Sequence, residues 1–91
     1  MARKERVTRV IDGDTFRTSS RKRSIRLANA NAPERGTKGG SAATRALRNM
    51  IGGKTVSVET VARDKYGRAI ANVKIGRHSV NKAVRERTRK R

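Results

Sequence analysis

The sequence predicts an all-β or α+β domain: a barrel of five short strands, with one helix between the third and fourth strands and a short C-terminal helix. Five segments alternate apolar and polar residues with the two-residue period of a β-strand. One longer segment repeats apolar residues at the spacing of an α-helix. Hydrophobic residues make up 33% of the 91 residues and aromatic residues 2%, so the core must be small and aliphatic, which suits such a barrel.

The first two strands are expected to form a hairpin. Residues 7–11 and 14–18 read as strands, and Asp12-Gly13 lies between them. An Asp-Gly pair is a strong hairpin signal, because a type I′ turn needs positive φ at both central residues. Residues 19–24 are polar and basic and form a second turn before the strand that begins at Ile25. We therefore expect a three-stranded meander.

The third strand, residues 25–27, places Arg26 on the face opposite its apolar neighbours. Pro33 has no backbone donor and pushes Ala32 toward an extended conformation, so the strand should end there. The carboxylate of Glu34 follows directly. A carboxylate just past a strand end, with an arginine on the same strand, suits the handling of a phosphodiester.

A helix is expected next, over residues 41–51, after a glycine-rich loop of residues 34–40. Ser41 is the predicted N-cap, and Gly52-Gly53 provides the left-handed stop. The apolar stripe of this helix is predicted to pack into the core. It consists of Ala42, Ala43, Ala46, Leu47, Met50 and Ile51.

The last two strands cover residues 56–61 and 69–75, with a turn at 64–67 between them. A short helix begins at Val80, and the basic residues 85–91 are expected to form a disordered arm. The domain should therefore span residues 1–84, with residues 85–91 as a tail. Five short strands with a helix between the third and fourth is the element order of an OB-fold, a barrel that commonly binds oligonucleotides.

The charge predicts a polyanionic partner. The chain has 25 Lys and Arg residues and 7 Asp and Glu residues, a net charge of +18 at pH 7. Such charge repels itself in a compact domain, and nucleic acid is the first candidate to relieve it. A membrane partner is not expected, because no apolar run approaches spanning length and no basic helix has a large apolar face. The alternative is a generally basic surface without a specific partner.

The N-terminus and the cysteine content give two weaker expectations. The first six residues are charged and lead straight into Val7 with no apolar signal region, which predicts an intracellular protein, although a secreted mature form would look the same. The absence of cysteine excludes disulfides and thiolate metal sites. We take a monomer as the default oligomeric state.

The acidic residues fall into two groups. Glu5, Glu59 and Glu86 are expected to be solvated partners of neighbouring bases. The other acids lie at turns or strand ends: Asp12, Asp14, Glu34 and Asp64. If the first and third strands lie together, Asp14 and Glu34 can project at one rim and hold a hard cation such as Ca²⁺. The alternative is that Asp12 and Asp14 only form the turn.

Several short motifs occur in a fixed order between Val7 and Val84: residues 10–16, 25–27, 32–34, 53–54, 64–68 and 80–81. Each motif alone is weak, but together they resemble the staphylococcal nuclease (thermonuclease) family. The resemblance implies an OB-fold and a Ca²⁺-dependent phosphodiesterase that cleaves DNA and RNA with little sequence preference. It also implies site residues, with Asp14, Asn31 and Ala32 at the metal, Arg26, Glu34 and Arg68 in catalysis, and Lys65 and Tyr66 at the substrate.

These implied roles fit the chemistry of the side chains. Glu34 would act as the general base on the attacking water. Arg26 and Arg68, on facing strands, would clamp the phosphoryl oxygens as their negative charge grows, because a guanidinium is a fixed fork of donors. A cation held by Asp14 would polarise the same phosphate.

The chain departs from the family pattern at the metal site. Asn31 stands where the family has an aspartate, and Ala32 stands where many members have threonine. The amide of Asn31 can offer an oxygen to Ca²⁺ but no charge, so Ca²⁺ affinity should be lower. Two readings therefore stay open: a slow metal-dependent nuclease, or a weakened nuclease-like module that only binds nucleic acid.

Overall fold

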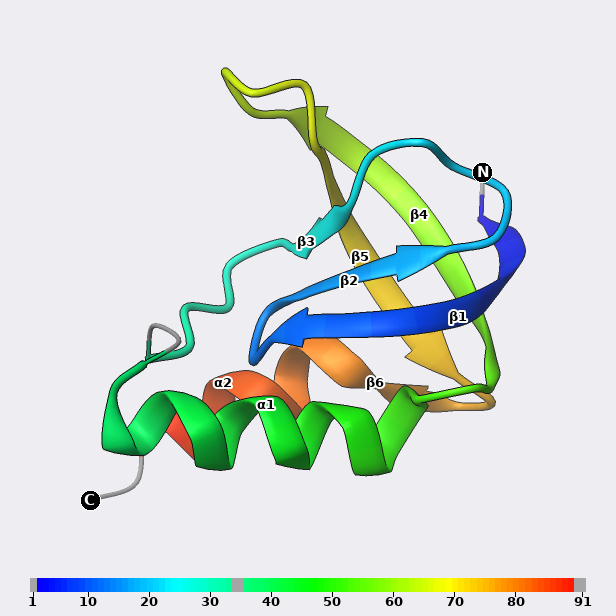
Figure 1. Ribbon diagram of the computed structural model, residues 1–91. Helices are drawn as coiled ribbons and strands as arrows, with labels where there is room; N and C mark the ends of the chain where they lie inside the picture. The colour runs from blue at the N-terminus through cyan, green and yellow to red at the C-terminus, as the bar shows by residue number, and fades with distance from the viewer. Residues whose placement is uncertain (1, 34–35, 90–91) are drawn as a thin grey trace.

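The structure is a computed structural model that describes residues 2–33 and 36–89. Glu34, the predicted general base, lies outside the described residues. Figure 1 shows the arrangement of the strands and helices. Within the described ranges they are β1 (Arg3–Asp12), β2 (Thr15–Thr18), β3 (Ile25–Leu27), α1 (Lys38–Ile51), β4 (Thr55–Arg63), β5 (Ala69–Ile75), β6 (His78–Ser79) and α2 (Val80–Arg89).

The strands close into a barrel, which confirms the predicted OB-fold. The described strands pair in the order β3-β2-β1-β4-β5-β6, and β3 also pairs with β5. The β3–β5 pairing is parallel, with Ile25 opposite Ala69 and Leu27 opposite Ala71, and it joins the two ends of the sheet. The other pairings are antiparallel. The short strand β6, which the sequence did not predict, extends the sheet beyond the five strands of the closed ring.

The core is small and aliphatic, as composition predicted. Both helices contribute to it: α1 packs along one end of the barrel and α2 lies behind α1 in the view of Figure 1. Leu47 and Ile51 of α1 are fully buried, whereas Ala42 of the predicted stripe is exposed. The largest fully buried side chains are Phe16, Ile25, Leu27, Leu47, Ile51, Val7, Val56, Val58, Val73 and Val80.

Helix α1 begins at Lys38, three residues before the predicted start. Thr37 is the N-cap instead of Ser41, and its side-chain oxygen accepts a hydrogen bond from the Gly40 backbone N–H at 3.0 Å. A Cβ at Gly39 would lie 3.2 Å from the Pro33 ring, so the glycine allows close packing of the helix start on the preceding segment. The prediction that Gly39 and Gly40 belong to a loop is therefore wrong, because both lie in α1.

The hairpin between β1 and β2 is not the predicted type I′ turn. Neither Asp12 nor Gly13 has the positive φ that a type I′ turn requires. The glycine is required for a different reason: a Cβ there would lie 2.5 Å from the Ala32 Cβ and 2.6 Å from the Ala43 Cβ. The hairpin thus packs directly against α1 and against the segment that follows β3.

Helix α2 does not end at Val84 as predicted but continues to Arg89. Val80 and Val84 are four residues apart on one face and are both buried, so the first half of the helix is held on the barrel. Residues 85–89 therefore belong to the helix, and residues 90–91 lie outside the described part. Neither described helix is long and apolar enough to cross a membrane.

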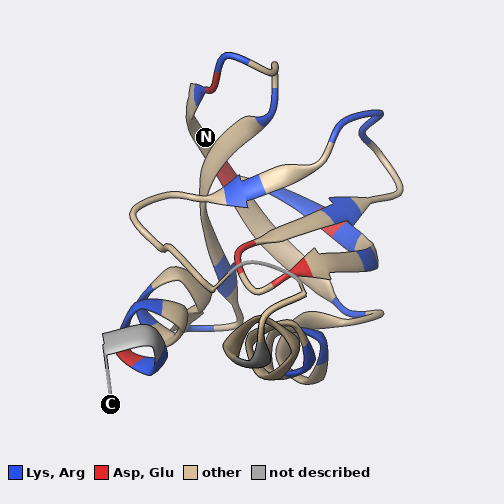
Figure 2. Cartoon of the chain, turned by 60° about the vertical axis from the view of Figure 1, so that its left-hand side comes forward, with Lys and Arg blue, Asp and Glu red and all other residues tan. Residues whose placement is uncertain are grey.

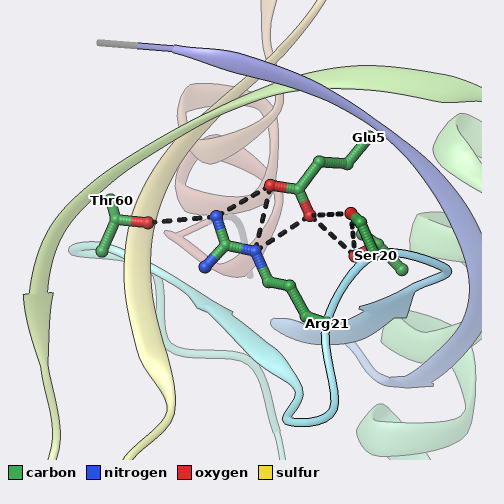
Figure 3. Close-up of polar contacts among 5 residues, drawn as sticks. Glu5, Ser20, Arg21 and Thr60 are labelled. Carbon is green, nitrogen blue, oxygen red and sulfur yellow. Dashed lines mark hydrogen bonds and ion pairs between the residues drawn. The ribbon is translucent and has the colours of Figure 1, made fainter.

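Glu5 is a buried network residue, not a solvated one as predicted. Strand β1 starts four residues early because residues 3–6 pair with β4, and this pairing carries Glu5 into the interior, where it is 4% exposed. Figure 3 shows the Arg21 guanidinium lying between Glu5 and Thr60. Burial alone would raise the pKa of Glu5, but hydrogen bonds from Arg21, Thr18 and Ser20 hold it below the usual value.

Candidate active site

Asp14 is the centre of the candidate site. It lies in the turn between β1 and β2 and is 8% exposed. Its Oδ1 accepts a hydrogen bond from the Thr15 hydroxyl at 2.9 Å, and its Oδ2 accepts one from the Ala32 backbone N–H at 3.0 Å. The Arg26 Nη2 lies 3.5 Å from the same Oδ2. Asp14 therefore joins the hairpin, strand β3 and the segment after β3.

Arg26 bridges two of the predicted metal-site residues. Its Nη2 also donates a hydrogen bond to Asn31 Oδ1. The strand register explains this position, because Arg26 pairs directly with Thr15, the residue after Asp14. Both contacts use one nitrogen, so Nη1 and Nε of Arg26 have no hydrogen-bond partner among the described residues.

Asp12 is a member of the site that the sequence identified only as a turn residue. Its Oδ1 accepts a hydrogen bond from the Asp14 backbone N–H at 3.2 Å. Burial and the neighbouring Asp14 carboxyl raise the pKa of Asp12. Burial would also raise the pKa of Asp14, but hydrogen bonding to Asp12, Ala32 N–H and Thr15 and the charge of Arg26 lower it. Asp14 is thus the more acidic member of the pair.

The oxygens around Asp14 suit a hard divalent cation. Asp14, Asp12 and the amide oxygen of Asn31 belong to neighbouring segments, and these are the donor types that Ca²⁺ prefers. In the part of the chain that the structure describes, no group of three or more His, Cys, Asp or Glu side chains could hold a metal. A cation here would therefore need Asn31, a backbone carbonyl or water to complete its ligands.

Arg68 is oriented by a second carboxylate, Asp64. The Arg68 Nε lies 2.6 Å from Asp64 Oδ2, and the Arg68 backbone N–H donates to Asp64 Oδ1 at 2.9 Å. Burial would raise the pKa of Asp64, but its hydrogen bonds from Arg68 and Tyr66 N–H lower it. Asp64, which the sequence placed with the turn acids, therefore holds Arg68 in position.

Lys65 and Tyr66 lie in the same turn, between β4 and β5. Tyr66 is 67% exposed. The Lys65 Nζ lies 5.3 Å from the ring centroid, and the Arg68 Cζ lies 5.6 Å from it. An exposed aromatic ring with two cations close to it can stack on a base while the cations attract a phosphate.

The structure places the predicted site residues in two neighbouring groups. Asp14, Arg26, Asn31 and Ala32 contact one another, as described above. Because Arg26 is opposite Ile70 in the parallel β3–β5 pair, Arg68, which directly precedes β5, lies two residues before the partner of Arg26. The condition considered from sequence, that the first and third strands lie together, is not met, since β2 separates them. Asp14 reaches the segment after β3 because it lies in the turn just before β2.

The described part of the chain is an OB-fold domain in which carboxylates pair with arginines. The family model described as "Staphylococcal nuclease homologue" matches residues 24–87. Two curated proteins, from Escherichia coli O157:H7 and Escherichia coli, are each named "Uncharacterized endonuclease" and are 40% identical over 70 residues. The match covers 75% of this chain and 46% of each relative, so the chain spans about half the length of these proteins. The chain belongs to the staphylococcal nuclease homologue family.

Proposed function

We propose that this chain is a Ca²⁺-dependent nuclease domain that hydrolyses phosphodiester bonds of DNA or RNA with little sequence specificity. The observation that carries the proposal is the bridge from Arg26 to Asp14 and Asn31, at the positions that family resemblance assigns to phosphate and metal. The bridge fixes a guanidinium beside a group of hard oxygen donors. A phosphodiester needs both kinds of partner.

The two arginines are prepared for phosphate in the same way. Asp14 and Asn31 hold Arg26 through Nη2, and Asp64 holds Arg68 through Nε. Each guanidinium has five N–H donors, so each retains donors for phosphate oxygens. Holding them in advance removes the entropy cost of ordering long side chains when the negative charge develops.

Ca²⁺ would be held by the carboxylate of Asp14, by the amide oxygen of Asn31 and by the backbone of Ala32. When bound, it would supply Lewis-acid polarisation of the phosphate. The protein contributes the ionised carboxylate of Asp14, whose lowered pKa keeps it ready for a cation. Glu34 is the proposed general base, a role inferred from the family motif.

A second candidate function is binding of nucleic acid without cleavage. The observation that favours it is Asn31, a neutral residue whose oxygen already accepts a hydrogen bond from Arg26. With one charge fewer at the metal site, the net charge of +18 would dominate the interaction with the polyanion.

Incubation of plasmid and single-stranded oligonucleotide with Ca²⁺, with and without chelator, distinguishes the two. We expect cleavage that requires Ca²⁺. Glu34→Gln should reduce the cleavage rate about 10²–10⁴-fold while binding persists, because it removes a general base. Glu59→Gln, on the exposed part of β4, is the matched control and should cleave normally. Absence of Ca²⁺-dependent cleavage in the unmodified protein would leave only the binding function.

A further inference from the structure

A basic groove runs along α1, outside the candidate active site. It consists of two adjoining hollows that share Thr44 and Arg48, and we call it the α1 groove. The first hollow, of about 400 Å³, lies between α1 and β1 and includes Arg9. The second, of about 350 Å³, lies at the start of α1 and includes Gly36 and Arg45.

The arginines of the α1 groove are exposed and lack acidic partners. Arg9, Arg45 and Arg48 make no ion pair within the described ranges. No acidic side chain lines either hollow among the described residues. Figure 2 shows the wider pattern: basic positions lie on strands, turns and helices, whereas acidic positions are few. These three arginines therefore contrast with Arg21, Arg26 and Arg68, each of which is held by a carboxylate.

The α1 groove adjoins the candidate site. Gly13, next to Asp14, packs closely against Ala43: a Cβ added at Gly13 would lie 2.6 Å from the Ala43 Cβ. Ala43 directly precedes the groove residue Thr44. The second hollow begins at Gly36, on the segment that also carries Ala32. A polymer bound at Asp14 and Arg26 can therefore continue over the start of α1 toward Arg9.

We infer that the α1 groove binds the sugar–phosphate backbone of the nucleic-acid strand beyond the scissile bond, an inference that rests on the proposed function. Charge identifies phosphate as the ligand, because the groove offers three guanidinium groups that make no ion pair with the described residues. The absence of aromatic residues identifies the backbone as the part that is contacted. The chain has one Phe, which is buried, and one Tyr, which lies in the β4–β5 turn, so the groove has no aromatic side chain on which a base could stack.

This arrangement predicts a dependence on substrate length. A dinucleotide has one phosphodiester, which the candidate site would occupy. An oligonucleotide of about 16 nucleotides, the upper end of OB-fold site sizes, reaches the groove as well. The groove should therefore increase affinity for long strands without changing affinity for short ones, and it should do so for any base sequence.

The test compares two variants of equal charge. One carries Arg9→Gln, Arg45→Gln and Arg48→Gln. The matched control carries three exposed changes outside the groove: Arg3→Gln, Lys74→Gln and Arg77→Gln. Binding of the long oligonucleotide and the dinucleotide is measured in chelator, so that the result does not depend on cleavage. Far-UV circular dichroism and thermal unfolding verify that both variants are folded.

We expect the groove variant to bind the long oligonucleotide at least about 10-fold more weakly, and its plot of log K against log salt to be less steep by about 2 for a single strand. The control should change each value much less, and dinucleotide binding should be unaltered. In the unmodified protein, NMR signals of Thr44, Gly52 and Gly53 should shift with the long oligonucleotide but not with the dinucleotide.

Three results would overturn the inference. First, the groove and control variants could lose affinity for the long oligonucleotide equally. Second, the long oligonucleotide could leave the NMR signals of the groove residues unshifted. Third, an acidic polypeptide could bind the groove as tightly as the oligonucleotide. The proposed function fails separately, by absence of Ca²⁺-dependent cleavage while the groove variant still loses binding.

Discussion

Replacement of Glu5 by glutamine tests the buried network of Figure 3. The Glu5 carboxylate accepts hydrogen bonds from Thr18 Oγ1 at 2.7 Å, Ser20 Oγ at 3.0 Å and Arg21 Nη2 at 2.7 Å. In Glu5→Gln the side-chain shape is kept, but one oxygen becomes an NH₂ group that faces the Arg21 donors. A hydrogen bond to a charged group contributes about 1.5–3 kcal/mol. We therefore expect the free energy of unfolding at pH 7 to fall by about 2–3 kcal/mol.

For a domain of this size, each kcal/mol lowers Tm by about 4–8 °C, so Tm should fall by about 10–20 °C. Thermal and urea unfolding followed by far-UV circular dichroism measure both quantities. Glu59→Gln, an exposed change of the same type on β4, is the control and should alter stability by at most about 0.5 kcal/mol. Equal stability of the two variants at pH 7 would refute the assignment of Glu5 as a buried, charge-paired residue.

The pH dependence of the same variant gives a sign that can be checked. The folded-state pKa of Glu5 is lowered, so its stabilisation is complete above the unfolded-state pKa of about 4.3 and is lost as pH falls through the folded-state pKa. Glutamine does not titrate. The stability difference between the unmodified protein and Glu5→Gln should therefore be largest near neutral pH and should shrink as the pH is lowered below about 4. A difference that grows toward acid pH would contradict the direction of the shift.

Three further changes test the site and the segment that carries it. Asn31→Asp should raise Ca²⁺ affinity about 10-fold by restoring a charged ligand, measured by calorimetry against the exposed control Asn49→Asp; equal affinities would place the metal elsewhere. Gly13→Ala should lower stability by about 1–3 kcal/mol, because its Cβ overlaps Ala32 and α1, and should also reduce cleavage measured well below Tm. Normal stability in denaturant would mean that the hairpin can move away. Asn81→Ala should cost about 2–4 kcal/mol, because it leaves Val73 N–H and Ala28 C=O without their buried partner, whereas Asn49→Ala should be nearly neutral.

The candidate site could be predicted from sequence because its residues come together locally. Asp14 directly precedes β2, and Arg26 lies on the adjacent strand β3, opposite Thr15. Short antiparallel connections therefore bring them together without long-range information. The third member, Asn31, follows the same strand by a few residues. Asp12 was missed as a site residue because its raised pKa depends on burial, which alternation of apolar residues does not reveal.

The errors concern contacts between residues far apart in the chain. The early start of β1, and with it the burial of Glu5, depends on pairing with β4, about 50 residues later. Gly39 and Gly40 favoured a loop by their intrinsic propensity, but both lie in the first turn of α1. There Gly39 packs against Pro33 of the preceding segment, and this tertiary contact outweighs the propensity. The sequence of the last helix resembles a polar tail, because it does not show that Val84 is buried on the barrel.

Two groups of arginines in this chain differ in their surroundings. In the described part, three are held by carboxylates, as the pairs Glu5–Arg21, Asp14–Arg26 and Asp64–Arg68. A held arginine contributes little net charge, but its guanidinium has a fixed direction, which is what a reacting phosphate requires. The arginines of the α1 groove have no acid beside them, so they contribute attraction without fixed geometry. If the groove and the site act on one strand, Asp14 and Asp64 lie where an arginine must be oriented, whereas no acidic side chain among the described residues lines the groove, where attraction suffices.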